Sequence, residues 1–421
     1  MSLITRQFLK VGRRSIIAAL FLFSTTSFSN DKISDQWSLQ QILTRASEQS
    51  TQLKSLENQI QAGEFRQEQA GLWENPELAA EIGRIRNDGT GGSSFDVSIK
   101  QSLPVFGQKN AARKVVESQR EITLTERKKE ALRIKHEVVR LSYRLAMFDE
   151  LVKHIDHRQK KWDIVVKFLK SRTLASPSQI LEKNLIQNRL REIEEKALDI
   201  DLAREEAWQS LNVFLGLDKR IEPKMEWIQK KTSRFSPDNL NLENNLEITQ
   251  QTKNILLAEA EVQTFESRAY PDLKLGVGVS RSRADVEEQS IYSILEFSVP
   301  IFDRGQASSN AARSMVASEK NILEHKRREV LSDFAKSALQ LANAQKKLKI
   351  FPLPLIDQLE REMDHTEIGF RKGLVAAPSF LELEEQVHEQ TAKVYEAQLE
   401  YIQARSSLLM ISGQDFSLGA N

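Results

Sequence analysis

The chain has 421 residues, and its 60 Lys and Arg against 59 Asp and Glu leave a formal net charge of +1. That balance argues against a nucleic-acid-binding protein, which needs a strong basic excess. The sequence contains no cysteine, which excludes disulfides, thiolate zinc sites, a cysteine nucleophile and an acylated lipoprotein cysteine. Only 16 Gly and 10 Pro interrupt the chain, so long helices are expected.

Residues 1–29 are predicted to be a secretory signal peptide. Basic residues up to Arg14 precede the apolar run IIAALFLF, and Ser27-Phe28-Ser29 offers small residues for cleavage. The apolar run is too short to span a bilayer comfortably. A retained anchor and, from the Arg13-Arg14 pair, a twin-arginine signal are the alternatives. The mature protein is expected to leave the cytoplasm.

The rest of the chain is a tandem duplication. SLPVF at 102–106 matches SVPIF at 298–302, and each is followed by N-A-A-R. The matching positions lie roughly 200 residues apart, well above the solenoid range. The sequence therefore predicts a first repeat at 30–229, a polar linker at 230–239, a second repeat at 240–415 and a tail at 416–421.

The first repeat reads as a helix, a β-hairpin at 77–103, a long helix at 105–172 and a helix at 177–215. Within the hairpin, apolar Phe95, Val97 and Ile99 alternate with polar residues, the period of a strand with one apolar face. The long helix measures roughly 100 Å. Its apolar residues recur at spacings of three and four with one polar interruption, Gln159, which predicts a coiled coil. They are Val138, Leu141, Leu145, Phe148, Val152, Ile155, Trp162, Val166 and Leu169.

The second repeat has the same order: a helix, a hairpin at 272–299, a long helix at 305–376 and a helix at 378–412. Two prolines in FPLPL are expected to break or kink the long helix at 351–355. A corner with Pro104 and Phe106, and again with Pro300 and Phe302, lies where each hairpin gives way to a long helix. Proline suits this boundary because it lacks the N–H that a strand needs and fits a helix's first turn.

The four predicted strands have the length of tilted barrel strands. Four strands cannot close a barrel, and an isolated pair of hairpins would leave open edges. Several chains pooling their hairpins would close one, with lipid outside and water inside. The alternative is a small soluble sheet packed on the helices. The signal peptide and the long coiled coil favour the barrel with a periplasmic extension.

AGLWENPEL at 70–78 and SLPVFGQKNAARKVVESQ at 102–119, within the duplicated plan, resemble the TolC-like outer-membrane efflux family, and most of all its CzcC-type heavy-metal branch. The resemblance implies a mainly helical homotrimer, with a twelve-stranded barrel in outer-membrane lipid above a helical periplasmic tunnel. It implies a passive exit duct of a Gram-negative tripartite system, exporting heavy-metal cations, with no enzymatic activity, no cofactor and no nucleic-acid partner. The partners it implies are a periplasmic adaptor and an inner-membrane transporter, expected to be a proton-driven RND-type pump.

The resemblance also implies functional residues at the turn between the long and the last helix. The adaptor-docking tip would comprise Phe370, Gly373 and Ala376, with Phe168 and Ser171 in a degenerate first copy. The channel constriction would lie at Glu382, Ser379 and Ser178. Trimer symmetry would make Glu382 a ring of three acids, a cation-selective constriction. The alternative for Glu382 is an ordinary exposed acid in the first turns of a helix.

Glu150, His154 and His157 lie on one side of the long helix and form a weak metal-site hypothesis. The favoured interpretation is a solvated surface, because Lys153, Arg158, Lys160 and Lys161 surround them. No nucleophile motif, P-loop or dinucleotide fingerprint occurs, which argues against an enzyme. A soluble periplasmic coiled-coil scaffold or adaptor is the main alternative function. Within the duct interpretation, a multidrug or type I secretion channel is the other.

Overall fold

The computed structural model describes residues 36–87, 90–171, 176–228, 241–283 and 287–417. The predicted signal peptide and the predicted linker lie outside these residues.

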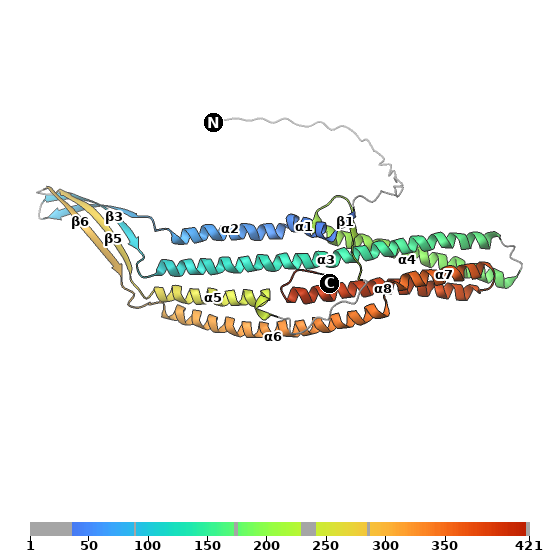
Figure 1. Ribbon diagram of the computed structural model, residues 1–421. Coiled ribbons are helices and arrows are strands. Elements are labelled where there is room, and N and C mark those ends of the chain that lie inside the picture. Colours follow the sequence, from blue (N-terminus) through green and yellow to red (C-terminus); the bar gives the residue numbers. More distant parts are fainter. Residues whose placement is uncertain (1–35, 88–89, 172–175, 229–240, 284–286, 418–421) are drawn as a thin grey trace, which may run out of the picture.

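The molecule is elongated, with a β-sheet at one end and helices along the rest of its length (Figure 1). Helix α3 (Gln108–Ser171) has 64 residues and spans roughly 96 Å at 1.5 Å per residue. No helix among the described residues combines the length and apolar character needed to cross a membrane. The other helices are α1 (Leu39–Gln49), α2 (Thr51–Gly71), α4 (Pro177–Leu215), α5 (Leu246–Ser267), α6 (Gln306–Ile350), α7 (Leu355–Arg371), α8 (Ala377–Ile411) and the 3₁₀-helix η2 (Leu242–Asn244).

Four strands form an antiparallel sheet in the order β2-β3-β5-β6. They are β2 (Glu77–Asn87), β3 (Thr90–Leu103), β5 (Asp272–Arg283) and β6 (Glu287–Ser298). The hairpins of the two repeats join through β3 and β5, which aligns Val97 with Val279 and Ile99 with Val277. Strands β2 and β6 are consequently the two edges of the sheet.

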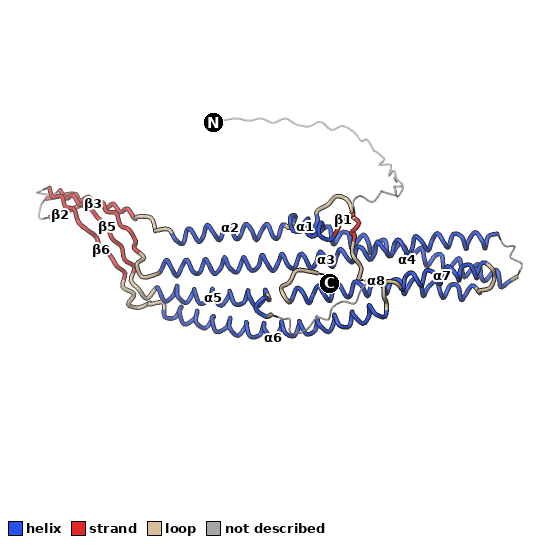
Figure 2. The backbone as a smooth tube through the Cα atoms, viewed as in Figure 1, coloured by secondary structure: helices blue, strands red, loops and turns tan. Residues whose placement is uncertain are grey.

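The apolar face of this sheet is exposed and the polar face is the more covered one. Leu78, Ile82 and Ile291 are 74%, 83% and 84% exposed, whereas Ser98 on the polar face is buried. The sheet extends beyond the ends of the helices (Figure 2). The alternative of a soluble sheet whose apolar face packs on the helices therefore does not describe this molecule.

The second long helix is broken, not kinked. Helix α6 ends at Ile350 and α7 begins at Leu355, with Pro352 and Pro354 between them. Proline lacks the N–H that a continuing helix needs and clashes with the preceding turn. The single helix predicted before the first hairpin is also two, α1 and α2. Ser50 divides them, and its hydroxyl accepts the N–H of Leu53 at 3.2 Å.

Local capping explains the bounds of α4. The Ser176 hydroxyl accepts the N–H of Gln179 at 3.4 Å, and the Gln179 side chain accepts the N–H of Ser176. Such a capping box, with Pro177 as the first helical residue, fixes where a helix starts. Gly216 ends α4 with a positive φ of 59°. The structure has α4 at the bounds that the sequence predicts.

Helices α5 and α8 meet end to end through Asn245. The Asn245 carboxamide oxygen accepts the N–H groups of Glu247 and Ile248, at 2.9 and 3.0 Å, and so caps the start of α5. Its amide nitrogen donates to the carbonyl of Ile411, the last residue of α8, at 2.7 Å. One buried side chain thereby satisfies unpaired backbone groups of two helix ends. Helices α5 and α8 together extend along α3 (Figure 1).

A small feature was not predicted: β1 (Gln36–Ser38) pairs in parallel with β4 (Glu222–Lys224) midway along the molecule. The apolar core is divided along the helices. One cluster lies beside β1 and another near the helix tip, where Trp162, Phe370 and Phe380 are buried. The helical body is thus packed from the middle to the tip.

Candidate functional site

The two strand-to-helix corners share a construction that includes a glycine and a glutamine. Gly107 and Gly305 have φ of 86° and 72°, a conformation that L side chains rarely adopt. The following residue, Gln108 or Gln306, turns back its side chain to accept a backbone N–H, from Phe106 at 3.1 Å or from Arg304 at 2.8 Å. The prolines and phenylalanines of the corners were predicted from the sequence, whereas this Gly-Gln pair was not.

Exposed aromatic rings gather at the corners. Phe106 stacks on Tyr270 with ring centroids 5.5 Å apart, which joins the first corner to the second repeat. Lys109 Nζ lies 5.0 Å from the ring centroid of Trp73. Trp73 and Phe302 are 62% and 93% exposed. Such aromatic rings at one end of an exposed apolar sheet are typical of a membrane–water boundary.

The polar face of the sheet contains side chains that cross a neighbouring strand. Tyr292 of β6 passes over Gly278 of β5, and its hydroxyl donates to Asp96 of β3 at 2.5 Å. Lys100 of β3 passes over Gly276 of β5 and pairs with Glu296 of β6 at 2.8 Å. A Cβ at Gly278 would lie 2.4 Å from the Tyr292 ring. The two glycines of β5 therefore make room for links between β3 and β6.

The helix tip between α7 and α8 is a tight turn on an aromatic core. Gly373 has a φ of 74°, and the N–H of Leu374 donates to the carbonyl of Gly369 at 2.9 Å. Phe370 is 2% exposed and stacks on Phe380 at 4.9 Å. Phe168 of α3 meets Phe370 edge to face at 6.2 Å. These rings hold the turn, while Leu374 is 79% exposed at its apex.

The remaining residues predicted at the tip are exposed in the single chain. Glu382, Ser379 and Ser178 all face solvent, as do Ala376 and Ser171. The Glu382 carboxylate accepts a hydrogen bond from Gln386 at 3.1 Å, within α8. The Ser171 hydroxyl donates to the carbonyl of Phe168 at 2.7 Å.

Comparison with known proteins now identifies the family. Residues 239–414 match the model of the outer membrane efflux protein family. The second repeat belongs to this family. No curated protein matches the sequence. Because the matched range covers the second repeat, the duplicated plan extends the assignment to the first.

Solved structures share the fold of this efflux protein. CusC, studied for its folding and transmembrane channel formation, superposes with a TM-score of 0.73 at 13% identity, over 89% of this chain and 92% of that one. The open-state MtrE channel of Neisseria gonorrhoeae gives 0.73 at 13% identity, over 90% of each chain. VceC of Vibrio cholerae gives 0.69 at 14%, over 90% of this chain and 97% of that one.

Membership places the efflux protein in the outer membrane of a Gram-negative cell, with a periplasmic extension. It is an outer membrane efflux channel of a tripartite system and not an enzyme. Homologues in the family work as trimers with periplasmic adaptors and inner-membrane pumps.

The histidines of α3 in this efflux protein differ from each other, and the solvated-surface interpretation holds only in part. His154 and Arg158 are buried, so the solvated-surface interpretation is wrong for them, although His157 is exposed. His154 Nδ1 lies 3.1 Å from Glu360 of α7, and its hydrogen bond is the largest cause that lowers the pKa of Glu360, to about 2. Glu150 instead pairs with Lys153 at 3.0 Å. Within the described ranges, no three His, Asp or Glu side chains are placed to hold a metal ion.

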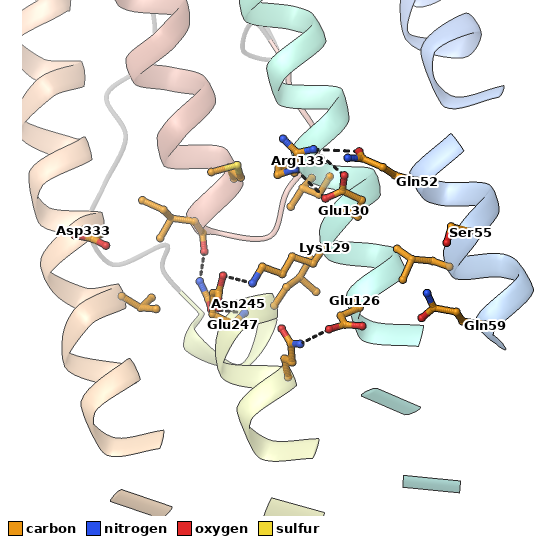
Figure 3. Close-up of a pocket in the computed structure, with 17 residues that line it drawn as sticks. Gln52, Ser55, Gln59, Glu126, Lys129, Glu130, Arg133, Asn245, Glu247 and Asp333 are labelled. Atoms are coloured by element: carbon orange, nitrogen blue, oxygen red, sulfur yellow. Dashed lines mark hydrogen bonds and ion pairs between the residues drawn. The ribbon is translucent and has the colours of Figure 1, made fainter. Parts of the chain in front are cut away.

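A hollow of about 820 Å³ lies where α5 and α8 of the efflux protein meet (Figure 3). Residues of α2, α3, α5, α6 and α8 line it. Arg133 of α3 lies between Gln52 of α2 and Glu130, while Lys129 pairs with Glu247 of α5. These pairs join three helices beside the Asn245 junction, which no pattern in the sequence indicated.

Proposed function

We propose that three copies of the chain assemble into one continuous duct, with a twelve-stranded barrel in outer-membrane lipid above a helical periplasmic tunnel. The observation that carries this proposal is the sheet itself. Its apolar face is exposed. In the order β2-β3-β5-β6, the edge strands β2 and β6 each pair with a strand of this sheet on one side only. In a membrane every backbone group must be paired, which a closed barrel achieves and an open sheet does not. Three times four strands gives twelve.

The helices also have exposed apolar surfaces that neighbouring copies would cover. Helix α2 lies on one side of α3, and α5 and α6 lie on its other side (Figure 1). Helices of both repeats expose apolar side chains: Leu198 and Leu202 on α4, and Leu339 and Ile350 on α6. A head-to-tail ring would bury one set against the other, as repeated heterologous contacts do when the rotation closes.

Cysteine cross-linking tests this assembly, because the natural chain has no thiol. Ala80→Cys on β2 is combined in turn with Ile291→Cys, Ser293→Cys and Leu295→Cys on β6. All four positions lie on the apolar face by strand register. We expect oxidation in membranes to give covalent dimers and trimers for the pair in register. Val97→Cys on the interior strand β3 is the control, and with it the same β6 cysteines should stay monomeric. Monomers from every β2 pair would contradict the ring.

At the periplasmic end we propose that the α7–α8 turn docks onto an adaptor protein. Gly373, Leu374 and Ala376 would provide the contact surface because they are exposed, and Phe370 and Phe168 would support it from the core. Ser171 lies on the corresponding end of α3. Glu382, Ser379 and Ser178 would form the constriction, with three Glu382 carboxylates around the axis of the trimer. A ring of acids at a narrow point favours cations.

We further propose that the exported substrates are heavy-metal cations, moved by a proton-driven RND-type pump. The N-P-E-L and N-A-A-R-K stretches support this proposal through their resemblance to the CzcC-type branch. The test compares a deletion strain with its complemented form on two panels, metal ions (Co²⁺, Zn²⁺, Cd²⁺, Cu⁺, Ag⁺) and lipophilic antibiotics, dyes and detergents. Sensitivity to metals alone supports the proposal. Sensitivity to organic compounds alone would keep the duct and discard the metal substrate.

A further inference from the structure

A small cavity lined by more cationic than anionic groups lies where α3, α4 and α8 pack together. Its volume is about 10 Å³, close to the minimum that one water-sized sphere requires. The residues around it are Ile155, Arg158, Arg189, Ile193, Lys196, Glu384 and His388. Three of these carry a permanent positive charge and one is a carboxylic acid. None of them belongs to the corners, the tip or the proposed constriction.

Arg158 contributes buried hydrogen-bond donors without acceptors to the cavity. It is 2% exposed, and its contact with a carboxylate is Nη2 to Glu384 Oε1 at 3.5 Å. Its Nε and Nη1 have no hydrogen-bond partner among the residues that the structure describes. A guanidinium cannot lose its proton in a protein, so these buried N–H groups require an acceptor.

Glu384 is shared with other donors, and it makes no hydrogen bond with Arg158 Nε or Nη1. Arg189 Nε donates to Glu384 Oε2 at 2.9 Å, and Trp162 Nε1 lies 3.5 Å from Oε1. Arg189 in turn also pairs with Glu192 at 2.7 Å. Lys196 lies 3.8 Å from Glu385 at the rim. Arg189 also lies 3.5 Å from Glu385, so Arg158 is the guanidinium whose N–H groups lack partners among the described residues.

We propose that this cavity binds a single monatomic anion, chloride under cellular conditions. The free N–H groups of Arg158 would donate to it, and Ile155 and Ile193 would shield it from bulk water. Sulfate and phosphate are too large for a cavity of one-water size. A bound halide would accept hydrogen bonds from Arg158 and hold three helices of the periplasmic body together.

Bromide diffraction tests the site on the unaltered protein. Crystals of the full chain grown in sodium bromide should show an anomalous peak beside Arg158. Electron density for a water molecule in the cavity, without an anomalous peak, would overturn the proposal. This measurement does not depend on whether any variant folds.

Thermal unfolding in detergent gives a second test. At constant ionic strength, replacing gluconate by chloride or bromide should raise the unfolding midpoint by about 2–4 °C and then saturate. Arg158→Met should abolish this rise. Arg140→Met is the matched control on α3, because Arg140 is exposed and pairs with Glu137 at 3.1 Å; it should retain the rise. An equal rise in wild type and Arg158→Met would contradict the site, as would no rise in wild type.

Discussion

At the scale of single residues, His136 illustrates how burial fixes a protonation state. It is 2% exposed, its Nε2 lies 2.9 Å from the carbonyl of Gln414 and its Nδ1 lies 2.9 Å from the Ser406 hydroxyl. Because a carbonyl can only accept, Nε2 donates to it, and Nδ1 accepts from Ser406. Both hydrogen bonds are made by the neutral ring. Burial lowers the pKa of His136, against the opposing effects of the Gln414 carbonyl and Asp415.

This lowered pKa predicts acid sensitivity. The unfolded chain takes up the proton near pH 6.5 and the folded chain only at lower pH, so stability is full above about 6.5 and is lost as pH falls. We expect the free energy of unfolding of wild type to fall below pH 6.5. His388, whose pKa burial lowers to about 4, acts in the same direction. Asp149, whose pKa burial raises to about 6, opposes both.

Chemical denaturation across pH 4 to 8 isolates the contribution of His136. His136→Gln should be less stable than wild type at pH 8 and should lose less stability on acidification. His325→Asn serves as control because His325 is exposed on α6, and it should follow the wild-type curve. Parallel curves for wild type and His136→Gln would show that His136 does not contribute to acid sensitivity.

At the scale of elements, glycine in β5 is a packing requirement. A methyl group at Gly278 would press on Tyr292, which bonds Asp96 across the strand. Gly278→Ala should therefore destabilise the sheet by about 1–3 kcal/mol, the usual range for overpacking. The measurement is the temperature at which the oligomer dissociates on a semi-native gel. Gly91→Ala is the matched control, because nothing lies within 4 Å of a Cβ there. Equal dissociation temperatures for the two variants would refute this role of Gly278.

The elements that the sequence predicts well are those with local signals. The hairpins follow from alternating residues such as Phe95, Val97 and Ile99, and α4 follows from Ser176 and Pro177. Each signal acts within a few residues, so no partner from elsewhere in the chain is needed to recognise it.

The failures come from contacts that are distant in sequence. One heptad seam describes one buried face, but α3 packs against α4, α8 and α7, which buries His154 and Arg158 as well. Glu360, the partner of His154, is more than two hundred residues away in the chain. The Gly-Gln pair of the corners was visible at Gly107 and Gly305. Gly107 directly follows Phe106, whereas Gly305 lies three residues after Phe302. Aligning the corners at their phenylalanines therefore does not align the two Gly-Gln pairs.

At the scale of the whole molecule, the exposed apolar sheet and the packed helical body require different solvents. The corners divide them, and their exposed aromatic rings are typical of a bilayer boundary. The chain has five tryptophans, and Trp73 beside the first corner differs from the others. Trp162 and Trp208 are buried in the helical body, and Trp37 and Trp227 are half-buried there.

Fluorescence quenching by lipid therefore reports where the membrane lies. In vesicles made with brominated phospholipids, a quencher confined to the acyl chains should reach Trp73 and leave the four tryptophans of the helical body largely unaffected. We expect Trp73→Phe to remove most of the quenching seen in wild type. Trp227→Phe, a loss of a half-buried ring about midway along the chain, should preserve it. Quenching that persists in Trp73→Phe would place the helical body against lipid, and unquenched wild type would place the corners outside the bilayer.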